Sequence, residues 1–306
     1  MSVASLTVCY NGERTLARQI GALLRQTQPL QEIVVVDNAS SDGTCALLAK
    51  QYPQVTVLRM KENLGIGGGL AAGMAYAVLE KRHDWVWTFD QDSVPNNDHV
   101  LQALLDGCEQ VGSAKGEVGI VAVLPVHEKT GDCYYPLLWQ DGFVRPSPDL
   151  IRQPVWFADL VISSGCMVRR EVVEEIGVPR ADFFIDFVDF EYCLRARSKG
   201  YKIAVVSAAK LVHEIGNARN VQLPWFSRLW PIQPPFREYY MSRNLAYAAW
   251  WLYPSHNVKR FVVGHLVRHA AGVLLFGSKR LACLRKMVQG FYDGRKASLG
   301  IRFLPT

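Results

Sequence analysis

The chain has 306 residues, of which 49% are hydrophobic and 11% aromatic, which excludes a disordered chain and provides for one large packed domain or one domain with an appended segment. Its seven cysteines are odd in number and lie far apart, which argues against a disulfide framework or a zinc knuckle and indicates a reducing cytosol. The formal net charge is +6, and the first residues lack the basic and apolar regions of a signal peptide, so we expect a cytoplasmic protein.

The first part of the chain alternates strand and helix patterns. Apolar or β-branched runs predict strands at residues 3–10, 32–36, 55–59 and 85–89, with helical patterns after each of the first three. The last helical pattern, at 67–81, contains several glycines. This order predicts a doubly wound, mostly parallel sheet, in which ligands bind beyond the carboxyl ends of the strands. The residues that fall at those ends, and can converge on one crevice, are Tyr10, Asp37, Asn63 and Asp90.

The rest of the chain is less regular. We expect a strand at 118–123, loops or a hairpin over 125–154, a strand region at 157–169, a helix at 187–199 and strands at 203–206 and 211–212. Four prolines indicate a linker at 223–235. Helices are expected at 236–253 and 258–292.

Two carboxylates directly follow the strand at 85–89. Asp90 and Asp92 are two residues apart and can point at one oxygen-ligated divalent cation. Mg²⁺ or Mn²⁺ keeps coordination positions open for phosphate oxygens and stabilises the charge of a departing diphosphate. A later histidine, His213, follows an apolar strand and can supply an imidazole to the metal or to the diphosphate.

Other polar groups at the strand ends suit a nucleotide. A carboxylate at Asp37 can accept the imide N–H of uracil or thymine, and Tyr10 can stack on a base while Asn11 and Gly12 turn the chain. The glycine-rich stretch 63–69 opens a helix, so its backbone amides can approach a ligand, or its glycines can let the helix pack closely on the sheet.

Two acids lie at the start of the helix expected at 187–199. A carboxylate at a helix N-terminus stays ionised and can act as the general base that deprotonates an acceptor hydroxyl. Asp189 and Glu191 cannot share one helical face, so only one of them is expected to be the base.

The end of the chain is strongly basic. From Lys259 onward there are ten lysines and arginines and a single acid, Asp293, and Trp250 and Trp251 precede this stretch. A basic segment with aromatic residues fits an anionic membrane face, a solvated helical subdomain or nucleic acid. The apolar stretch 261–276 is too short and too polar to span a bilayer, which leaves an interfacial helix. We expect peripheral attachment to the inner face of the cell membrane and no nucleic-acid partner, because the Asp90–Asp92 crevice repels phosphates unless metal is bound.

Taken in order, these motifs resemble those of the family 2 glycosyltransferases. The matching stretches are Val-x-Tyr-Asn at 8–11, Val-Asp-Asn-Ala-Ser-Ser-Asp-Gly-Thr at 36–44, Asn-Leu-Gly at 63–65, Asp-Gln-Asp-Ser at 90–93, Ser-Ser-Gly-Cys at 163–166, the acidic run at 184–192 and His213. Gln91 and Ser93, with the acidic run and the stretch Phe-Arg-Glu-Tyr-Tyr-Met-Ser-Arg-Asn at 236–244, resemble the rhamnosyltransferase branch, which includes enzymes of rhamnolipid and O-antigen synthesis.

The resemblance implies a GT-A fold in residues 1–222, with a nucleotide-sugar half at 1–115 and an acceptor half at 116–222, followed by a helical, basic segment at 223–306. It implies an inverting displacement in which Asp189, with Glu191 as rival, is the base, and in which Ser164 and Gly165 lie near the acceptor. The implied metal ligands are Asp90, Asp92 and His213. The residues expected to bind the donor are Tyr10, Asn11, Asp37, Asn63, Gly65, Asp90 and Gln91.

The implied donor is dTDP-L-rhamnose and the implied acceptor is a hydroxyl of a lipid-linked or polysaccharide precursor. Two positions depart from the family pattern: Ala71 stands where the glycine-rich loop usually has Asn, and Val188 stands where many relatives have Glu before the base. A transferase of another hexose from a UDP-sugar and a nucleotide-sugar-binding protein without turnover are the alternatives.

Overall fold

The structure is a computed structural model, and it describes residues 1–111, 118–128, 131–213, 218–223 and 226–305. The chain divides into two compact units. The first unit comprises Met1–Trp139, Val144–Ala181 and Asp189–Glu214. The second unit comprises Gln140–Phe143, Asp182–Val188 and Ile215–Thr306. The domain boundary expected between residues 222 and 223 stays a prediction.

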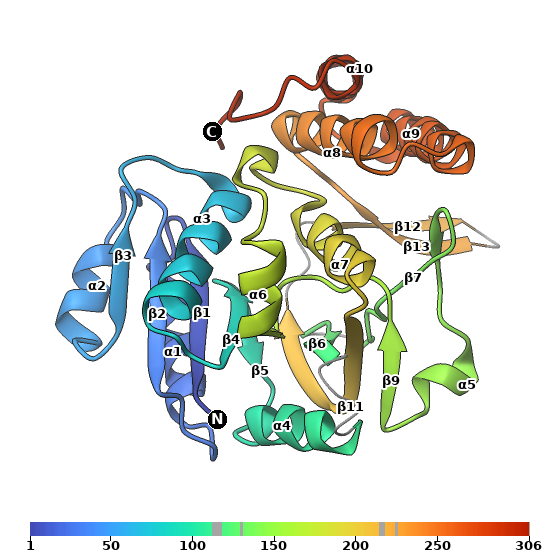
Figure 1. Cartoon of the computed structure of the whole chain (residues 1–306). Helices are drawn as coiled ribbons and strands as arrows, with labels where there is room; N and C mark the ends of the chain where they lie inside the picture. Colours follow the sequence, from blue (N-terminus) through green and yellow to red (C-terminus); the bar gives the residue numbers. More distant parts are fainter. Residues whose placement is uncertain (112–117, 129–130, 214–217, 224–225, 306) are drawn as a thin grey trace. The chain divides into compact units, whose positions relative to one another are not determined.

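The first unit is built on a large mixed sheet (Figure 1). Its strands are β1 (Val3–Cys9), β2 (Glu32–Asp37), β3 (Thr56–Arg59), β4 (Trp85–Asp90), β5 (Ser93–Pro95), β6 (Val118–Val126), β9 (Val155–Ala158), β10 (Cys166–Arg169) and β11 (Lys202–His213). They lie in the order β3-β2-β1-β4-β10-β6-β11-β5, and β9 pairs with β11. The strands β3, β2, β1 and β4 are parallel, whereas β10 runs antiparallel to both of its neighbours. The doubly wound, mostly parallel sheet with a helical C-terminal part is thereby confirmed.

Helices cover both faces of this sheet (Figure 1). They are α1 (Leu16–Leu24), α2 (Thr44–Gln51), α3 (Gly65–Met74) with its π-helical continuation η1 (Ala75–Glu80), α4 (Val100–Gln110), α6 (Arg170–Ile176) and α7 (Val188–Ser198). Side chains alternate along β1, so Val8 faces α3 while Thr7 faces α1. A Cβ on Gly69 would lie 2.4 Å from Val8 Cγ1, so this glycine lets α3 pack closely on the sheet.

Loops or a hairpin were expected over 125–154. In the described part of this segment, the elements after the end of β6 are short: β7 (Leu138–Trp139), β8 (Phe143–Val144) and α5 (Pro148–Ile151). Further along the chain, a 3₁₀ turn, η2 (Ala181–Phe183), precedes α7. The single strand region expected at 157–169 is wrong, because β9 ends at Ala158 and β10 begins at Cys166. The chain turns between them at Gly165, whose φ of +84° is readily adopted only by glycine.

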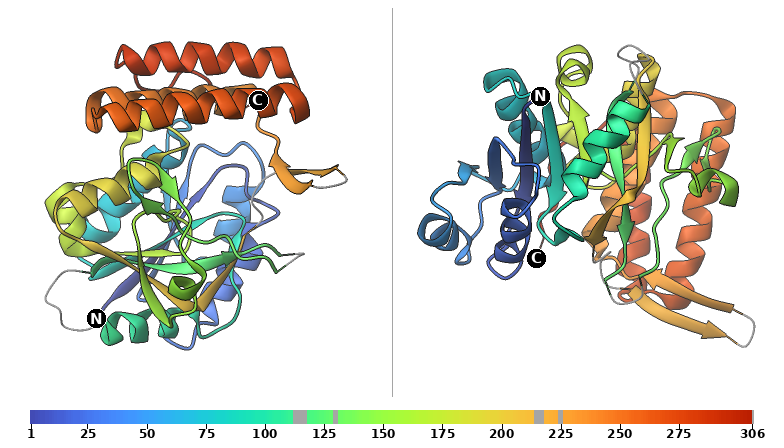
Figure 2. Two further views of the ribbon diagram at one scale, coloured as in Figure 1. Left: turned by 90° about the vertical axis from the view of Figure 1, so that its right-hand side faces the viewer. Right: turned by 90° about the horizontal axis from the view of Figure 1, so that it is seen from below.

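The second unit consists mainly of β12 (Ala218–Leu223), β13 (Phe226–Pro231), α8 (Pro235–Tyr247) with its π-helical end η3 (Ala248–Leu252), α9 (His256–Phe276) and α10 (Arg280–Arg295). Its helices are drawn in orange and red in Figure 2. Among the described residues, no helix combines the length and the apolar character needed to cross a bilayer.

Two expectations for this unit are wrong. The linker expected at 223–235 contains the strand β13, which pairs with β12, while residues 224–225 lie outside the described residues. Pro231 is the last residue of β13 and Pro235 the first of α8, positions that do not require a backbone N–H. The single helix expected at 258–292 is two helices. Gly277 is extended and Lys279 has a φ of +48°, so neither residue continues α9.

Candidate active site

The carboxyl ends of the parallel strands place two acidic side chains at one edge of the sheet. Asp37 lies beside Cys9 in the register of β1 and β2, and Asp90 lies beside Val8 in the register of β1 and β4. Each strand therefore delivers its terminal carboxylate next to the end of β1, as the strand order predicts.

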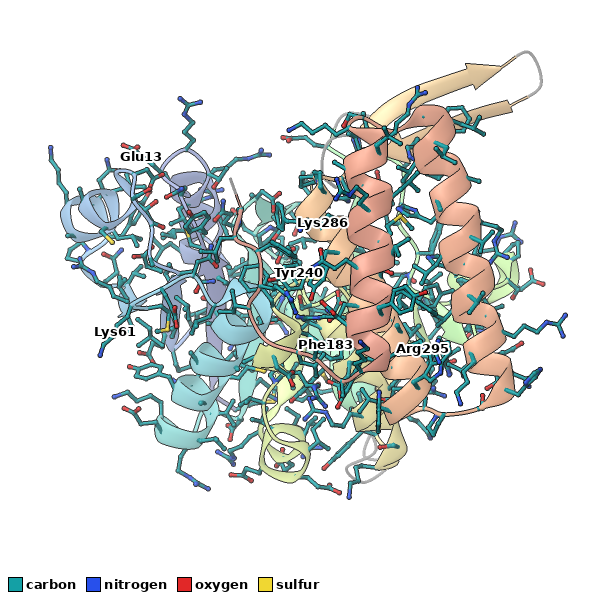
Figure 3. The ribbon with its side chains drawn as sticks, turned by 90° about the horizontal axis from the view of Figure 1, so that it is seen from above. Glu13, Lys61, Phe183, Tyr240, Lys286 and Arg295 are labelled. Carbon is teal, nitrogen blue, oxygen red and sulfur yellow. The ribbon has the colours of Figure 1, made fainter. Side chains whose placement is uncertain are left out.

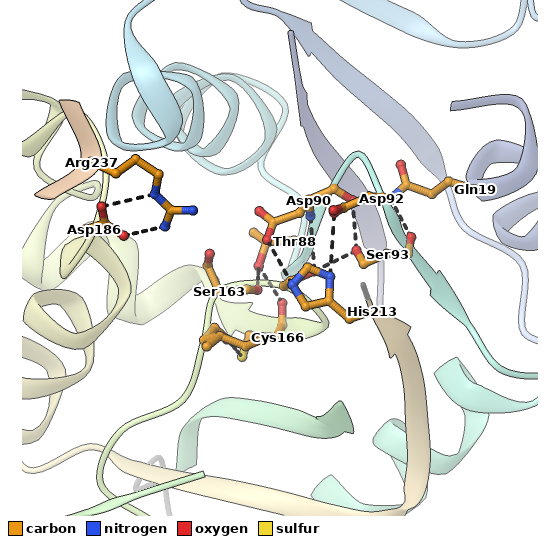
Figure 4. A network of polar contacts seen from close by, with 12 residues as sticks. Gln19, Thr88, Asp90, Asp92, Ser93, Ser163, Cys166, Asp186, His213 and Arg237 are labelled. Carbon is orange, nitrogen blue, oxygen red and sulfur yellow. Dashed lines mark hydrogen bonds and ion pairs between the residues drawn. The ribbon is translucent and has the colours of Figure 1, made fainter. Parts of the chain in front are cut away.

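Asp90, Asp92 and His213 form a cluster at the end of β4 (Figure 4). Each offers one ligand atom, and these atoms all lie within 4.8 Å of one another. His213 Nε2 lies 3.7 Å from Asp90 Oδ2, and Nδ1 lies 3.6 Å from Asp92 Oδ1. His213 joins residues more than a hundred positions away because the end of β11 pairs with β5, which places it opposite Ser93.

The residues present fit a divalent cation. Two carboxylates and an imidazole are a suitable donor set, and Asp90 and Asp92 keep 34% and 41% of their side-chain surface exposed, so a ligand can approach them. In contrast, His213 is buried, and its Nδ1 has no hydrogen-bond partner among the described residues. A buried polar atom without a partner is costly, and a metal or an anionic ligand would satisfy it.

A ring of hydrogen bonds holds the Asp90 backbone. The Asp90 N–H donates to Ser164 Oγ (3.1 Å), Ser164 Oγ donates to Ser93 Oγ (2.6 Å), and Ser93 Oγ donates to the Asp90 carbonyl (2.8 Å). Thr88 Oγ1 donates to the carbonyl of Ser163 on the same loop (2.5 Å). The loop expected to meet the acceptor is therefore fastened directly to the strand that carries the metal cluster.

Gln19 is a site residue that sequence reasoning missed. Its side chain is fully buried in α1, and its Nε2 donates to the carbonyls of Asp90 (2.5 Å) and Ser93 (2.7 Å). Its Oε1 accepts from Thr7 Oγ1 (2.9 Å). The available signal is that a glutamine occupies the apolar stripe of its helix, because a polar group on a buried face requires partners.

Asp37 is 3% exposed and accepts hydrogen bonds from the Ser40 N–H (3.3 Å) and from Cys45 Sγ (3.0 Å). The hydrogen bond to Asp37, then burial, raises the pKa of the Cys45 thiol. Burial and then the charge of Asp37 raise the pKa of Cys9 to about 12. Both thiols therefore stay protonated, and Cys45 acts as a donor to the carboxylate.

The neighbouring residue, Asn38, was also missed by sequence reasoning. It is 2% exposed, donates to the Gly65 carbonyl (2.9 Å) and accepts from the Leu64 N–H (3.0 Å). Asn63 Oδ1 accepts from the Gly65 N–H (2.8 Å). These bonds shape the loop that opens α3 and hold it at the end of β2.

Tyr10, Asn11 and Gln91 lie together at the end of β1. Gln91 Oε1 accepts from the Tyr10 N–H (2.7 Å), which links the end of β4 to the end of β1. Asn11 has a φ of +53°, and its Oδ1 accepts from the Ser41 N–H (2.9 Å). Gln91 thus helps to position the end of β1 through its hydrogen bond to the Tyr10 backbone.

The two acids at the start of α7 differ in their surroundings. Glu191 is 2% exposed, and both of its oxygens accept from Arg195, at 3.0 Å each. Asp189 is half-buried and lies in the first turn of the helix. Burial, then Cys193, then the charge of Asp189 raise the pKa of the Cys166 thiol. Asp189 therefore lies within electrostatic reach of the residue that follows Ser164 and Gly165.

Residues 6–177 match the family model described as Glycosyl transferase family 2. Among curated proteins, the chain is similar to the dTDP-rhamnosyl transferase RfbF of Shigella flexneri, with 27% identity over 307 residues, which are 98% of this chain and 97% of the relative. It is also similar to the galactofuranosyltransferase GlfT1 of Mycolicibacterium smegmatis, with 25% identity over 220 residues, 70% of this chain and 71% of the relative.

Two solved structures resemble the fold. S. aureus TarS in complex with UDP-GlcNAc superimposes with a TM-score of 0.61 at 15% identity, over 96% of this chain and 81% of that chain. GalNAc-T7 with UDP, GalNAc and Mn²⁺ superimposes with a TM-score of 0.63 at 16% identity, over 97% of this chain and 56% of that chain. At these identities the likeness concerns the fold alone, and it confirms the expected GT-A architecture.

Proposed function

Since the chain belongs to glycosyl transferase family 2, we propose that it transfers L-rhamnose from dTDP-L-rhamnose to a hydroxyl of a lipid-linked or polysaccharide acceptor, with inversion at the anomeric carbon. The observation that carries this proposal is that the cluster of Asp90, Asp92 and His213 lies at the same end of the parallel strands as the buried carboxylate of Asp37. Such an edge suits a nucleoside diphosphate, with the base toward Asp37 and the diphosphate toward the cluster.

The choice of donor rests on similarity. One relative that is similar over nearly the whole chain is a dTDP-rhamnosyl transferase. The galactofuranosyltransferase relatives and the UDP complexes of the fold neighbours support a UDP-sugar as the second candidate. Asp37 would accept the imide N–H of thymine or uracil equally well, so this residue does not distinguish the two donors.

In the proposed reaction, Asp189 accepts the proton of the acceptor hydroxyl while the hydroxyl oxygen bonds to the anomeric carbon. The bond between that carbon and the diphosphate oxygen breaks, and its electron pair leaves with dTDP. Asp90, Asp92 and His213 would hold Mg²⁺ or Mn²⁺, which, when bound, offsets the negative charge of the departing diphosphate. Asp189 is preferred to Glu191 because it is only half-buried, whereas Glu191 is 2% exposed and accepts from Arg195 with both oxygens.

The test is product formation from a donor panel with purified protein and Mn²⁺. We expect sugar transfer from dTDP-L-rhamnose to a panel of lipid and glycan acceptors, detected by mass spectrometry, and little from UDP-glucose or UDP-galactose. Preferential use of a UDP-hexose would replace the first candidate by the second. Donor binding without transfer to any acceptor would favour a nucleotide-sugar-binding protein instead.

We also propose that the second unit attaches to the inner face of the cell membrane. The exposed side of α9 carries Val263, Val267 and Leu274, which follow each other at helical spacing and are 42%, 63% and 48% exposed. Leu275 and Leu281 are 65% and 76% exposed at the turn between α9 and α10. The exposed cations around these apolar residues are Arg260, Arg268, Lys279 and Arg280. An apolar face bordered by cations is typical of helices that lie on anionic membranes.

Vesicle binding tests this attachment. The full chain should sediment with anionic vesicles, less so at high salt, and Val267→Asp should weaken binding. Leu79→Asp serves as the matched control, because Leu79 is 48% exposed in the first unit. Equal partitioning onto neutral and anionic vesicles, or an equal effect of the two variants, would contradict the proposal.

A further inference from the structure

The segment that leads into α7 has an unusual backbone. Phe184, Asp186 and Phe187 have φ angles of +63°, +62° and +66°, in the left-handed region. Side chains with a Cβ rarely adopt this region, and bulky aromatic residues do so least readily. Left-handed residues persist only where their surroundings hold them. Residues 182–188 belong to the second unit, and Asp189 follows Val188 directly along the chain.

Asn244, in α8, donates hydrogen bonds to several main-chain carbonyls of this segment. Its Nδ2 donates to the carbonyls of Phe183 (3.0 Å), Ile185 (2.9 Å) and Asp186 (2.8 Å). Its Oδ1 accepts from Arg243 Nε (2.9 Å), which fixes the orientation of the amide. The Asn244 side chain is fully buried, so water cannot take its place as the donor to these carbonyls.

Arg243 adds a second set of bonds. Its Nη2 donates to the carbonyls of Asp182 (2.8 Å) and Phe183 (2.9 Å), and its Nη1 donates to the carbonyl of Gly300 (2.5 Å). The guanidinium is fully buried and lies over the ring of Tyr240, 4.6 Å from its centroid. Burying a charge is costly, so an arginine at this place has a function that an apolar side chain could not serve. Its function here is to donate to main-chain carbonyls.

The third contact is an ion pair. Both carboxylate oxygens of Asp186 accept from Arg237, Oδ2 from Nε at 3.3 Å and Oδ1 from Nη2 (Figure 4). This two-pronged pair fixes a side chain as well as the backbone of the left-handed segment. Phe184 stacks on Tyr240 with their ring centroids 4.8 Å apart. Tyr240 is labelled in Figure 3.

The helix that carries these residues is itself firmly held. A Cβ on Gly290 of α10 would lie 2.2 Å from the Tyr239 carbonyl, so α8 and α10 pack backbone against backbone. Ser242 Oγ donates to the Met287 carbonyl (2.8 Å), and Tyr239 donates to Asp293 (2.7 Å). The donors on α8 are thus held in place by the packing of α8 on α10 within the second unit.

We propose that Arg237, Arg243 and Asn244 are positioning residues for the base of the transfer reaction. By holding residues 182–187, of which Phe184, Asp186 and Phe187 are left-handed, they fix where α7 begins and hence where Asp189 stands. The inference rests on the proposed role of Asp189. It assigns the stretch 236–244 a role in the transfer reaction.

The test compares Asn244→Ala with Ser242→Ala, a neighbouring buried residue of α8 whose bond goes to α10 and not to residues 182–187. We expect Asn244→Ala to lower kcat about 10- to 100-fold, because small displacements of a reacting group have such effects. The Kd of dTDP with Mn²⁺ should stay within about two-fold. Amide hydrogen exchange of residues 183–190 should rise in Asn244→Ala and not in Ser242→Ala.

If Asn244→Ala does not fold, Arg237→Gln provides the same comparison, because the Arg237 side chain is 32% exposed and its loss leaves the core intact. Equal kcat in the Ala variants of Asn244 and Ser242 would overturn the proposal, and so would raised exchange without a loss of kcat. A wild-type protein that transfers no sugar would refute the proposed function. In that case, unchanged exchange at 183–190 would separately refute the holding role of α8.

Discussion

Removing one carboxylate from the cluster of Asp90, Asp92 and His213 should raise the stability of the metal-free protein. Without metal, the ligand atoms of Asp90 and Asp92 lie within 4.8 Å of each other, and each carboxylate also contacts His213. Two unit charges at that distance repel by about 3.5 kcal/mol at an effective dielectric constant of about 20, and by about 0.9 kcal/mol in water. Both side chains are about a third or more exposed, so the lower end applies, about 1 kcal/mol.

Asp92→Asn should therefore stabilise the metal-free protein while it weakens metal binding. A gain of about 1 kcal/mol corresponds to a Tm increase of roughly 2–4 °C in a unit of about 200 residues. In the wild type, Mn²⁺ at about 100 times its Kd adds about 2.7 kcal/mol of stability, and this response should be largely lost in the variant. Transfer activity should fall with it.

The assay is thermal unfolding with EDTA and with a series of Mn²⁺ concentrations, followed by transfer rates on the same samples. Asp98→Asn is the matched control, because Asp98 is 46% exposed and pairs with Arg25 rather than with another acid. This control should show no Tm gain in EDTA and a full response to Mn²⁺. A full Mn²⁺ response in Asp92→Asn, or a lower Tm in EDTA, would refute the assignment of the cluster as a metal site.

Substitutions at the proposed base, at the packing of α8 on α10 and at a half-buried histidine of α9 give three further predictions. Asp189→Asn should lower kcat by about 10²- to 10⁴-fold with dTDP binding unchanged. Glu191→Gln should mainly lower Tm, because Arg195 loses its carboxylate partner. Similar kcat losses in both variants would refute Asp189 as the sole base. Gly294→Ala should destabilise the second unit by about 1–3 kcal/mol in thermal unfolding, because the added Cβ would lie 2.1 Å from the Arg243 carbonyl oxygen. An unchanged Tm would contradict the close packing of α8 and α10. Burial, then the charges of His269 and Arg268, lowers the pKa of His265 to about 4, so the folded chain binds fewer protons than the unfolded chain between about pH 6.5 and 4. The free energy of unfolding should therefore fall by up to about 3 kcal/mol as the pH drops through this window. His265→Phe should flatten the pH profile of Tm.

The strand ends could be predicted because their signals are local. An apolar run that stops at Asp37 or Asp90 marks a strand and its carboxyl end, and the alternation with helices makes the strands parallel. The register then brings both residues beside the end of β1 without further information. His213 was proposed as a ligand from its position after an apolar strand, but its approach to Asp90 and Asp92 depends on the pairing of β11 with the short strand β5, which no local pattern indicates.

The supporting hydrogen bonds could not be predicted in the same way. Gln19 and Ser93 hold the Asp90 backbone from separate elements, and their partners are main-chain carbonyls that carry no residue-specific signal. The roles of Asp189, Asp37 and the other proposed site residues stay predictions, because geometry shows which groups are close and not which group reacts. The two wrong expectations in the second unit share one cause: prolines and glycines mark interruptions, but a strand end, a helix start and a linker produce the same signal.

The left-handed segment before α7 explains why Arg243 and Asn244 suit their positions. Residues 184–187 contain no glycine or asparagine, so no local pattern predicts their conformation. Carbonyls in such a segment have no helix or sheet partners, and buried carbonyls need donors. Arginine offers five N–H donors and asparagine two, which together cover the carbonyls of Asp182, Phe183, Ile185 and Asp186. The conservative-looking replacement Arg243→Lys would keep the charge but lose the fork that reaches the carbonyls of Asp182, Phe183 and Gly300, so charge alone cannot explain the residue.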